Sequence, residues 1–189
     1  MYGHMKKTVL TYGFISGGIM VLMLAGSSLL MRGAGSSDID FDKWSWVGFT
    51  TILIAFVLIY FAQASYRDNA GGGTISYGKA FRIGLLVSVV ASICYVIGWL
   101  LISHFMIPDF MEKYQAFELR KLQASGMSEA GIAKRMKEME DYRKMYANPL
   151  INAAITFLEP FPLGVVVSLI SAAIVRMKKK TGVPQPAAR

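Results

Sequence analysis

Residues 83–106 read IGLLVSVVASICYVIGWLLISHFM, a run of 24 residues that contains no Asp, Glu, Lys or Arg. A helix needs about 20 apolar residues to cross the hydrocarbon core of a bilayer. Pro108 follows the run, and a proline inside a helix removes a backbone hydrogen bond and usually ends or kinks it. The run therefore predicts a membrane-spanning helix.

Two further uncharged runs cover residues 8–31 and 44–65, and a third apolar run, interrupted by Glu159 alone, covers residues 157–175. None shows the alternation of apolar and polar residues that a membrane β-strand requires, so helices are the expected form. The composition agrees, because only 17% of the 189 residues are charged, where a soluble domain carries about 25%. The sequence predicts an all-α integral membrane four-helix bundle, with residues 1–189 forming a single membrane domain.

The first run has a competing interpretation as a secretory signal peptide, because Lys6 and Lys7 precede it and small residues follow it. Its apolar part is longer than the roughly 7–15 residues of a signal peptide, so we expect it to remain as a span. Met5 is an alternative to Met1 as the natural first residue.

The basic residues are distributed unequally between the two predicted sides of the membrane. With both termini in the cytoplasm, the inner segments carry ten basic residues and one acidic residue, Asp68, whereas the outer segments carry ten basic and eleven acidic residues. Cytoplasmic segments of membrane proteins are enriched in Lys and Arg. Membrane orientation and contact with anionic lipids therefore explain the net charge of +8, without nucleic acid as a partner. We expect residues 181–189 to be a disordered cytoplasmic tail. The inner basic residues are Lys6, Lys7, Arg67, Lys79, Arg82, Arg176, Lys178, Lys179, Lys180 and Arg189.

Two short connections resemble ligand-binding motifs but lack essential residues. Residues 38–42 hold three alternating aspartates, as a calcium loop does, but no turn glycine and no closing glutamate follow. Residues 73–80, GTISYGKA, approach a phosphate-binding loop, but Ala80 replaces the Ser or Thr that would bind Mg²⁺ and no strand precedes them. We expect a solvated loop in the first case, and a glycine turn before a helix capped by Ser76 in the second.

Residues 109–148, between the third and fourth spans, form a connection that is too long for a loop without secondary structure or function. Apolar residues recur at helical spacing in both halves, and Gly126 and Ser128 supply a helix stop and an N-cap between them. The pattern predicts a helical hairpin outside the membrane, on the periplasmic side. We expect its apolar stripes to pack on each other, or otherwise on a partner protein or the bilayer surface. The stripes comprise Phe110, Tyr114 and Phe117 before the turn, and Ile132, Met136, Met139, Tyr142 and Tyr146 after it.

Glu159 is followed by Pro160 and Pro162 and interrupts the apolar sequence of the fourth span. About 24 Å of helix separate it from Arg176, which places the carboxylate near the outer boundary of the hydrocarbon core. An ionised group at that depth needs a partner or water and is often functional. Two interpretations remain open: a structural kink at the membrane boundary, or a site that binds an ion, proton or ligand.

His104 is expected near the same level on the third span, where it either forms a hydrogen bond with Glu159 or makes no contact. One histidine and one glutamate do not provide the three or more protein ligands of a typical zinc site. The lone Cys94 excludes a disulfide within the chain. We expect no catalytic, cofactor-binding or metal-binding residues.

Gly13 and Gly17 form a GxxxG step in the first span. Small residues at this spacing allow two helices to approach closely. Packing within the bundle is the expected role, in preference to dimerisation.

Two segments, GGGTISYGKAFRIG (71–84) and NPLINAAITFLEPFPLGVVVSLISAAIVR (148–176), resemble bacterial membrane proteins grouped as domain of unknown function 4199. The resemblance extends from about residue 6 to residue 180 and includes the four spans, the long helical segment and the Glu-Pro-Phe-Pro sequence. It implies a bacterial inner-membrane location. It implies no reaction, because that family has no established activity.

Two functional hypotheses follow. The first is a non-enzymatic interaction or structural protein, embedded in the lipid bilayer, whose hairpin contacts a membrane or periplasmic protein. The alternative is a small transporter or channel subunit with Glu159 as an ion- or proton-coupled group, which would require a homo-oligomer to form a pathway. An enzyme is not expected, because the chain shows no arrangement of nucleophile and base.

Overall fold

The computed structural model describes residues 2–33 and 39–177, and every regular element there is an α-helix. The all-α prediction is thus confirmed for these residues, while the predicted tail at 181–189 lies outside them. The seven helices are α1 (Tyr2–Gly33), α2 (Phe41–Asn69), α3 (Tyr77–Phe105), α4 (Phe110–Ala124), α5 (Glu129–Tyr146), α6 (Pro149–Leu158) and α7 (Phe161–Met177).

Four helical stretches are long and apolar enough to cross a membrane, which confirms the four predicted spans. Each contains 29 or 30 residues and exceeds the predicted apolar run. The first three extend into polar flanks, and the fourth is extended by the largely apolar residues 149–156. A helix of this length measures about 43 Å and exceeds the thickness of a hydrocarbon core. The four stretches are Gly3–Arg32, Phe41–Asn69, Tyr77–Phe105 and Pro149–Met177.

The fourth span begins at Pro149, eight residues earlier than the predicted start at residue 157. Pro149 occupies the first helical turn, and the side chain of Asn148 accepts a hydrogen bond from the backbone N–H of Leu150 at 3.0 Å. This N-cap begins α6 directly after the hairpin. The span is therefore a broken helix made of α6 and α7.

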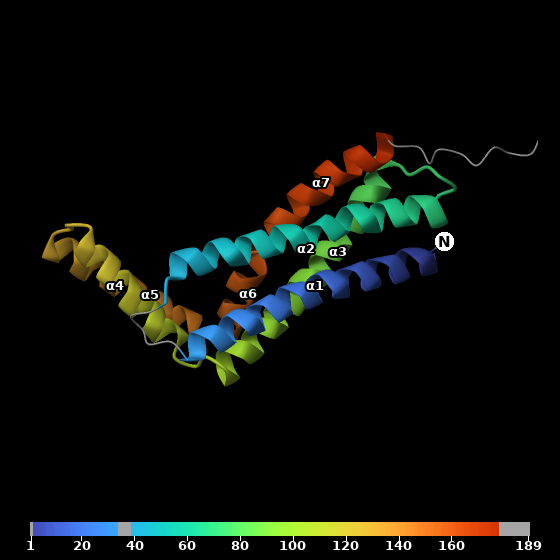
Figure 1. The fold of residues 1–189 in the computed structure, drawn as a ribbon. Coiled ribbons are helices and arrows are strands. Elements are labelled where there is room, and N and C mark those ends of the chain that lie inside the picture. Colours follow the sequence, from blue (N-terminus) through green and yellow to red (C-terminus); the bar gives the residue numbers. More distant parts are fainter. Residues whose placement is uncertain (1, 34–38, 178–189) are drawn as a thin grey trace, which may run out of the picture.

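The long helices run side by side, and α3 is central because it packs against α1, α2, α6 and α7 (Figure 1). The middle of the core contains large side chains that are completely inaccessible to solvent, including Phe56 and Ile59 of α2 and Ile83 and Val87 of α3. These residues fix α2 against α3 in one register.

The glycine step of the first span lies in the contact between α1 and α3. A Cβ atom added to Gly13 would lie 2.7 Å from Cβ of Val90, and one added to Gly17 would lie 2.5 Å from Cβ of Cys94. Both distances are shorter than real Cβ contacts, so only glycine permits this approach. The pair therefore serves packing within the bundle, and Gly98 continues the contact against Val21.

A group of buried polar residues, here called the polar seam, joins α2, α3 and α7. Gln63 donates a hydrogen bond from Nε2 to the carbonyl of Ser168 at 3.3 Å, and the hydroxyls of Ser88 and Ser168 lie 3.4 Å apart. Gly84 and Gly164 leave the space for these side chains, because a Cβ at either would lie less than 3 Å from a seam atom. The seam thus holds three helices together by polar contacts inside an apolar bundle.

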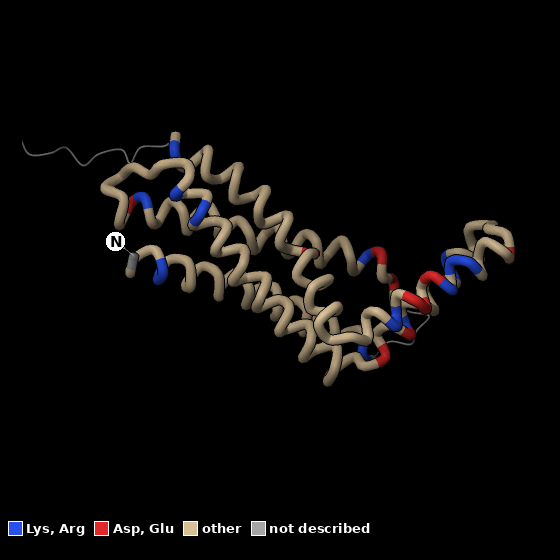
Figure 2. Tube along the Cα trace, turned by 180° about the vertical axis from the view of Figure 1, so that it is seen from behind, with Lys and Arg blue, Asp and Glu red and all other residues tan. Residues whose placement is uncertain are grey.

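The two ends of the molecule differ in charge (Figure 2). Lys and Arg gather at the end that holds the N-terminus, here called the basic end, and both signs occur at the opposite end, here called the hairpin end. At the basic end Arg67 is 8% exposed, pairs with Asp68 at 2.7 Å and donates to the carbonyl of Val175. The described basic residues of this end are Lys6, Lys7, Arg67, Lys79, Arg82 and Arg176.

Helices α4 and α5 form the predicted hairpin, which projects obliquely from the bundle (Figure 1). Gly126 adopts φ +72° at the turn, a conformation that favours glycine, and Ser128 caps α5 by accepting from the N–H of Gly131 at 3.3 Å. Ser76 occupies the N-cap position of α3, but its side chain forms no capping hydrogen bond.

Helices α4 and α5 pack on each other, and the stripe of α4 also packs on the bundle, a contact that the sequence did not predict. Ring centroids of Phe110, Tyr114 and Phe117 lie 5.4–5.7 Å from that of Phe41, at the start of α2. An apolar stripe shows which face of a helix is buried, but not which element covers that face. Here Phe41, the first residue of α2, contacts the stripe of α4. The hairpin is therefore anchored to the bundle through α4.

Candidate functional site

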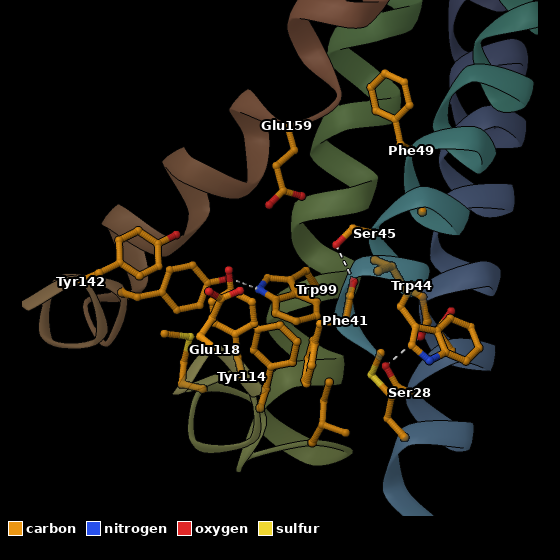
Figure 3. Close-up of a pocket in the computed structure, with 18 of the residues that line it drawn as sticks. Ser28, Phe41, Trp44, Ser45, Phe49, Trp99, Tyr114, Glu118, Tyr142 and Glu159 are labelled. Atoms are coloured by element: carbon orange, nitrogen blue, oxygen red, sulfur yellow. Dashed lines mark hydrogen bonds between the residues drawn. The ribbon is translucent and has the colours of Figure 1, made fainter. Parts of the chain in front are cut away.

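A chamber of about 990 Å³ lies at the hairpin end, between α1, α2, α3 and the hairpin, with Glu159 in its wall (Figure 3). It forms because the fourth span changes neighbours at its break. Helix α7 packs against α2 and α3, whereas α6 packs against α3 and α5. The hairpin covers the resulting space.

The break has a simple chemical origin. Pro160 and Pro162 have no backbone N–H, so the carbonyls four residues earlier, at Thr156 and Leu158, lose their usual helical donors. Helix α6 ends at Leu158 and α7 begins at Phe161. Pro160 is fully buried, and its carbonyl accepts from the N–H of Gly164 at 3.0 Å, which starts the new helix.

Glu159 is the C-cap residue of α6, and its carboxylate points into the space between the helices (Figure 3). Oε2 accepts a hydrogen bond from the hydroxyl of Tyr95 at 3.0 Å. Glu159 remains exposed, because the chamber rather than packed side chains surrounds it. A carboxylate at this position can therefore exchange a proton or meet an ion.

The carboxylate meets α3 far from either end of that helix. Its partner Tyr95 is in the middle of the apolar run 83–106, ten residues before the end of α3 at Phe105. Ten helical residues correspond to about 15 Å. The predicted position near the outer hydrocarbon boundary was counted from Arg176, and the largely apolar helical residues 149–158 lie on the other side of Glu159.

His104 is exposed near the end of α3, and its ring contacts that of Phe105 at 4.7 Å. The hydrogen bond that the described structure gives to Glu159 comes from Tyr95 instead. Sequence reasoning missed Tyr95, although it is the single tyrosine in the third apolar run, which is a usable signal. The structure therefore brings Glu159, Pro160 and Tyr95 together and leaves His104 at the surface.

Trp99 and Tyr146 connect the bundle to the hairpin in the chamber wall. Trp99 Nε1 donates to the hydroxyl of Tyr146 at 2.6 Å, and the Trp99 ring meets that of Phe110 edge-on at 4.9 Å. Burial raises the pKa of Tyr146 to about 12, so its hydroxyl stays protonated at neutral pH. This contact fixes the end of α5 over α3.

The charges in the chamber wall are predominantly negative. Glu159, Glu118 and Glu138 line it, and Arg135 is the single basic residue among the described lining residues. Arg135 pairs with Glu138 at 3.2 Å. Glu159 differs from the other two glutamates because it belongs to a membrane-spanning stretch, where Glu118 and Glu138 belong to the hairpin.

Residues 2–33 and 39–177 offer few side chains for metal binding or for cysteine chemistry. No group of three or more His, Cys, Asp or Glu side chains could hold a metal ion there. Cys94 is a free cysteine packed against Gly17. The arrangement is a chamber with mostly apolar and aromatic walls and one carboxylate from the fourth spanning stretch.

Four apolar spanning helices with a chamber at one end define a multi-span membrane protein. The family described as "Protein of unknown function (DUF4199)" matches residues 11–177, and the chain belongs to this family. No curated protein and no solved structure shows significant similarity to the chain.

Proposed function

We propose that the protein is a non-enzymatic membrane transport or channel subunit that admits a small ligand or ion to the chamber, with Glu159 as the proton- or ion-coupled group. The observation that carries the proposal is the position of this carboxylate. It lines the chamber, lies at a helix break and is held by Tyr95. Broken helices and embedded carboxylates occur together in transporters.

The energetics of a membrane carboxylate support this role. An ionised group in the hydrocarbon region is costly unless it has partners or water. Tyr95 supplies one hydrogen bond, whereas an ionised carboxylate can accept about four. The remaining acceptor capacity faces the chamber, so a proton or a cation would stabilise Glu159 there.

A second copy of the chain fits this proposal. The polar seam closes the bundle towards the basic end, and four spans offer few helices for a continuous pathway. A homo-oligomer in a bacterial inner membrane, with cytoplasmic termini and a periplasmic hairpin, would place the chamber on the periplasmic side.

The test compares carboxyl reactivity and ion flux. A hydrophobic carbodiimide should modify Glu159 about tenfold faster than Glu138, since only Glu159 lies within a span. In proteoliposomes under an imposed potential, Glu159→Gln should abolish the proton or cation flux of the wild-type protein. Glu129→Gln, on the hairpin but outside the chamber wall, is the matched control and should keep it. An unreactive Glu159, with equal flux in wild-type and Glu159→Gln protein across a range of pH, would overturn the proposal.

A second candidate is an interaction protein whose hairpin contacts a membrane or periplasmic partner. The observation that favours it is that α4 and α5 contain no buried residue, and that Met145 is 50% exposed. A photo-crosslinking residue at Met145 or Lys137 should then capture one heterologous protein in native membranes. Capture of other copies of the chain alone would count against this candidate and agree with the oligomer.

A further inference from the structure

We propose that the chamber binds a lipophilic organic cation, such as a hydrophobic amine or a quaternary ammonium or phosphonium ion. The inference deepens the proposed function and rests on it, because it assigns a ligand class to the site that contains Glu159. Four properties of the chamber support it: charge, coordination, wall chemistry, and size with access.

The charge favours a cation. Arg135 is paired with Glu138, so Glu118 and Glu159 remain as lining carboxylates without an ion pair among the described residues. A negatively charged ligand would be repelled by both, and the repulsion is strong where water is scarce. A cation would be attracted to the same positions.

The coordination favours an organic cation over a metal ion. Calcium takes about six to eight oxygen ligands, and magnesium needs near-octahedral geometry. Glu159 offers one carboxylate, and the nearby hydroxyl of Tyr95 already donates its proton to that carboxylate. An ammonium group with an organic body needs only one counter-charge and apolar walls.

The walls provide such surroundings. Trp99, Tyr95 and Tyr146 line the chamber beside Glu159 and present aromatic rings, whose faces attract cations. Met20 and Met23 line the opposite side on α1, and methionine side chains adapt to ligands of different shape. The chamber thus suits the apolar body as well as the charge.

The size and access agree. A volume of about 990 Å³ is at the upper end of the range for small-molecule pockets, far more than a bare ion needs. Phe49 of α2 lines the chamber near the level of Glu159 and is also 47% exposed on the membrane-facing surface (Figure 3). The chamber wall therefore continues into the surface that contacts lipid, from which a lipophilic cation would arrive.

The experiment measures equilibrium binding of tetraphenylphosphonium to the purified full-length protein in detergent. Tetraphenylborate, with the same body and the opposite charge, is the ligand control. We expect saturable binding of the cation and none of the anion. Glu159→Gln should weaken cation binding about tenfold or more, because the charge partner is lost. Glu129→Gln should leave it within about twofold, since that exposed carboxylate of α5 does not line the chamber.

The outcomes separate this inference from the proposed function. Equal binding of both ions, unaffected by Glu159→Gln, overturns the assignment of a cation. If tetraphenylphosphonium does not bind but Glu159 reacts with the carbodiimide, the assignment of a cation is overturned and the proposed function stands. If the cation does not bind and Glu159 does not react with the carbodiimide, both proposals are overturned. Protection of Glu159 from the carbodiimide by tetraphenylphosphonium supports both proposals. If Glu159→Gln fails to fold, Glu159→Asp retains the charge and should keep measurable binding.

Discussion

The hydroxyl of Tyr95 in the middle of α3 donates a hydrogen bond to the carboxylate of Glu159 at the break between α6 and α7. The two residues are 64 positions apart in the chain. Their contact ties the hairpin-end half of the fourth span to the central helix, at the one place where prolines prevent continuous helical bonding.

Tyr95→Phe should therefore lower the free energy of unfolding by about 1 kcal/mol, the usual size of a hydrogen bond between membrane helices. The measurement is unfolding in mixed micelles. A double-mutant cycle with Glu159→Ala should give a coupling energy of about 0.5–2 kcal/mol. Tyr12→Phe is the control, because the described structure shows no side-chain hydrogen bond for Tyr12. Additive effects in the cycle would mean that the contact contributes nothing.

Gly17→Ala should destabilise the protein by about 1–3 kcal/mol, because the new methyl group would overlap Cβ of Cys94. Gly18→Ala is a matched control, since nothing lies within 4 Å of a Cβ at that position. Alanine favours a helix over glycine by about 1 kcal/mol, so the control should be neutral or stabilising. Equal effects of the two substitutions would contradict the close α1–α3 contact.

The contact between α5 and α3 should weaken at alkaline pH. Burial raises the pKa of Tyr146 to about 12, whereas an unfolded tyrosine titrates near pH 10. The folded state thus binds this proton more tightly, and its stabilising effect is complete below about pH 10 and is lost as the pH rises towards 12. Fluorescence of Trp99 should report the change, with the other two tryptophans replaced by phenylalanine. In Tyr146→Phe the transition should disappear; its persistence would assign it to another group.

The orientation of the protein can be tested with single cysteines in a Cys94→Ala background. The basic end is expected in the cytoplasm, since Lys and Arg favour that side. In intact cells, an impermeant maleimide should label Gln123→Cys on the hairpin, and should label Lys79→Cys only after permeabilisation. The reverse pattern would invert the assignment of the chamber to the periplasmic side.

The spans could be predicted from the sequence because length and apolarity are local properties of a run. The predicted fourth span started at residue 157, close to the single charge of Glu159, whereas the apolar helical stretch starts at Pro149. The apolar stretch continues on both sides of Glu159 as α6 and α7, and the chamber that Glu159 faces is formed by segments far apart in the sequence.

The site was predictable only in part for the same reason. Glu159 and its prolines stand out in an apolar run, but Tyr95 and Phe41 become significant only through partners far away in the chain. His104 was placed at the level of Glu159 by counting residues, and counting cannot tell which face of a helix a side chain occupies. Which side chains meet across the bundle depends on how the helices pack, and the sequence of one segment does not specify that packing.

The polar seam has a consequence for conduction. Gln63, Ser88 and Ser168 fill the interior towards the basic end so closely that Gly84 and Gly164 cannot accept a methyl group without a shift of their neighbours. Under the proposed function, the seam would close the route from the chamber towards the basic end in this conformation. Passage through to the other face requires α7 to part from α2 and α3, so the rate-limiting barrier would lie in three buried polar residues and not in the chamber itself.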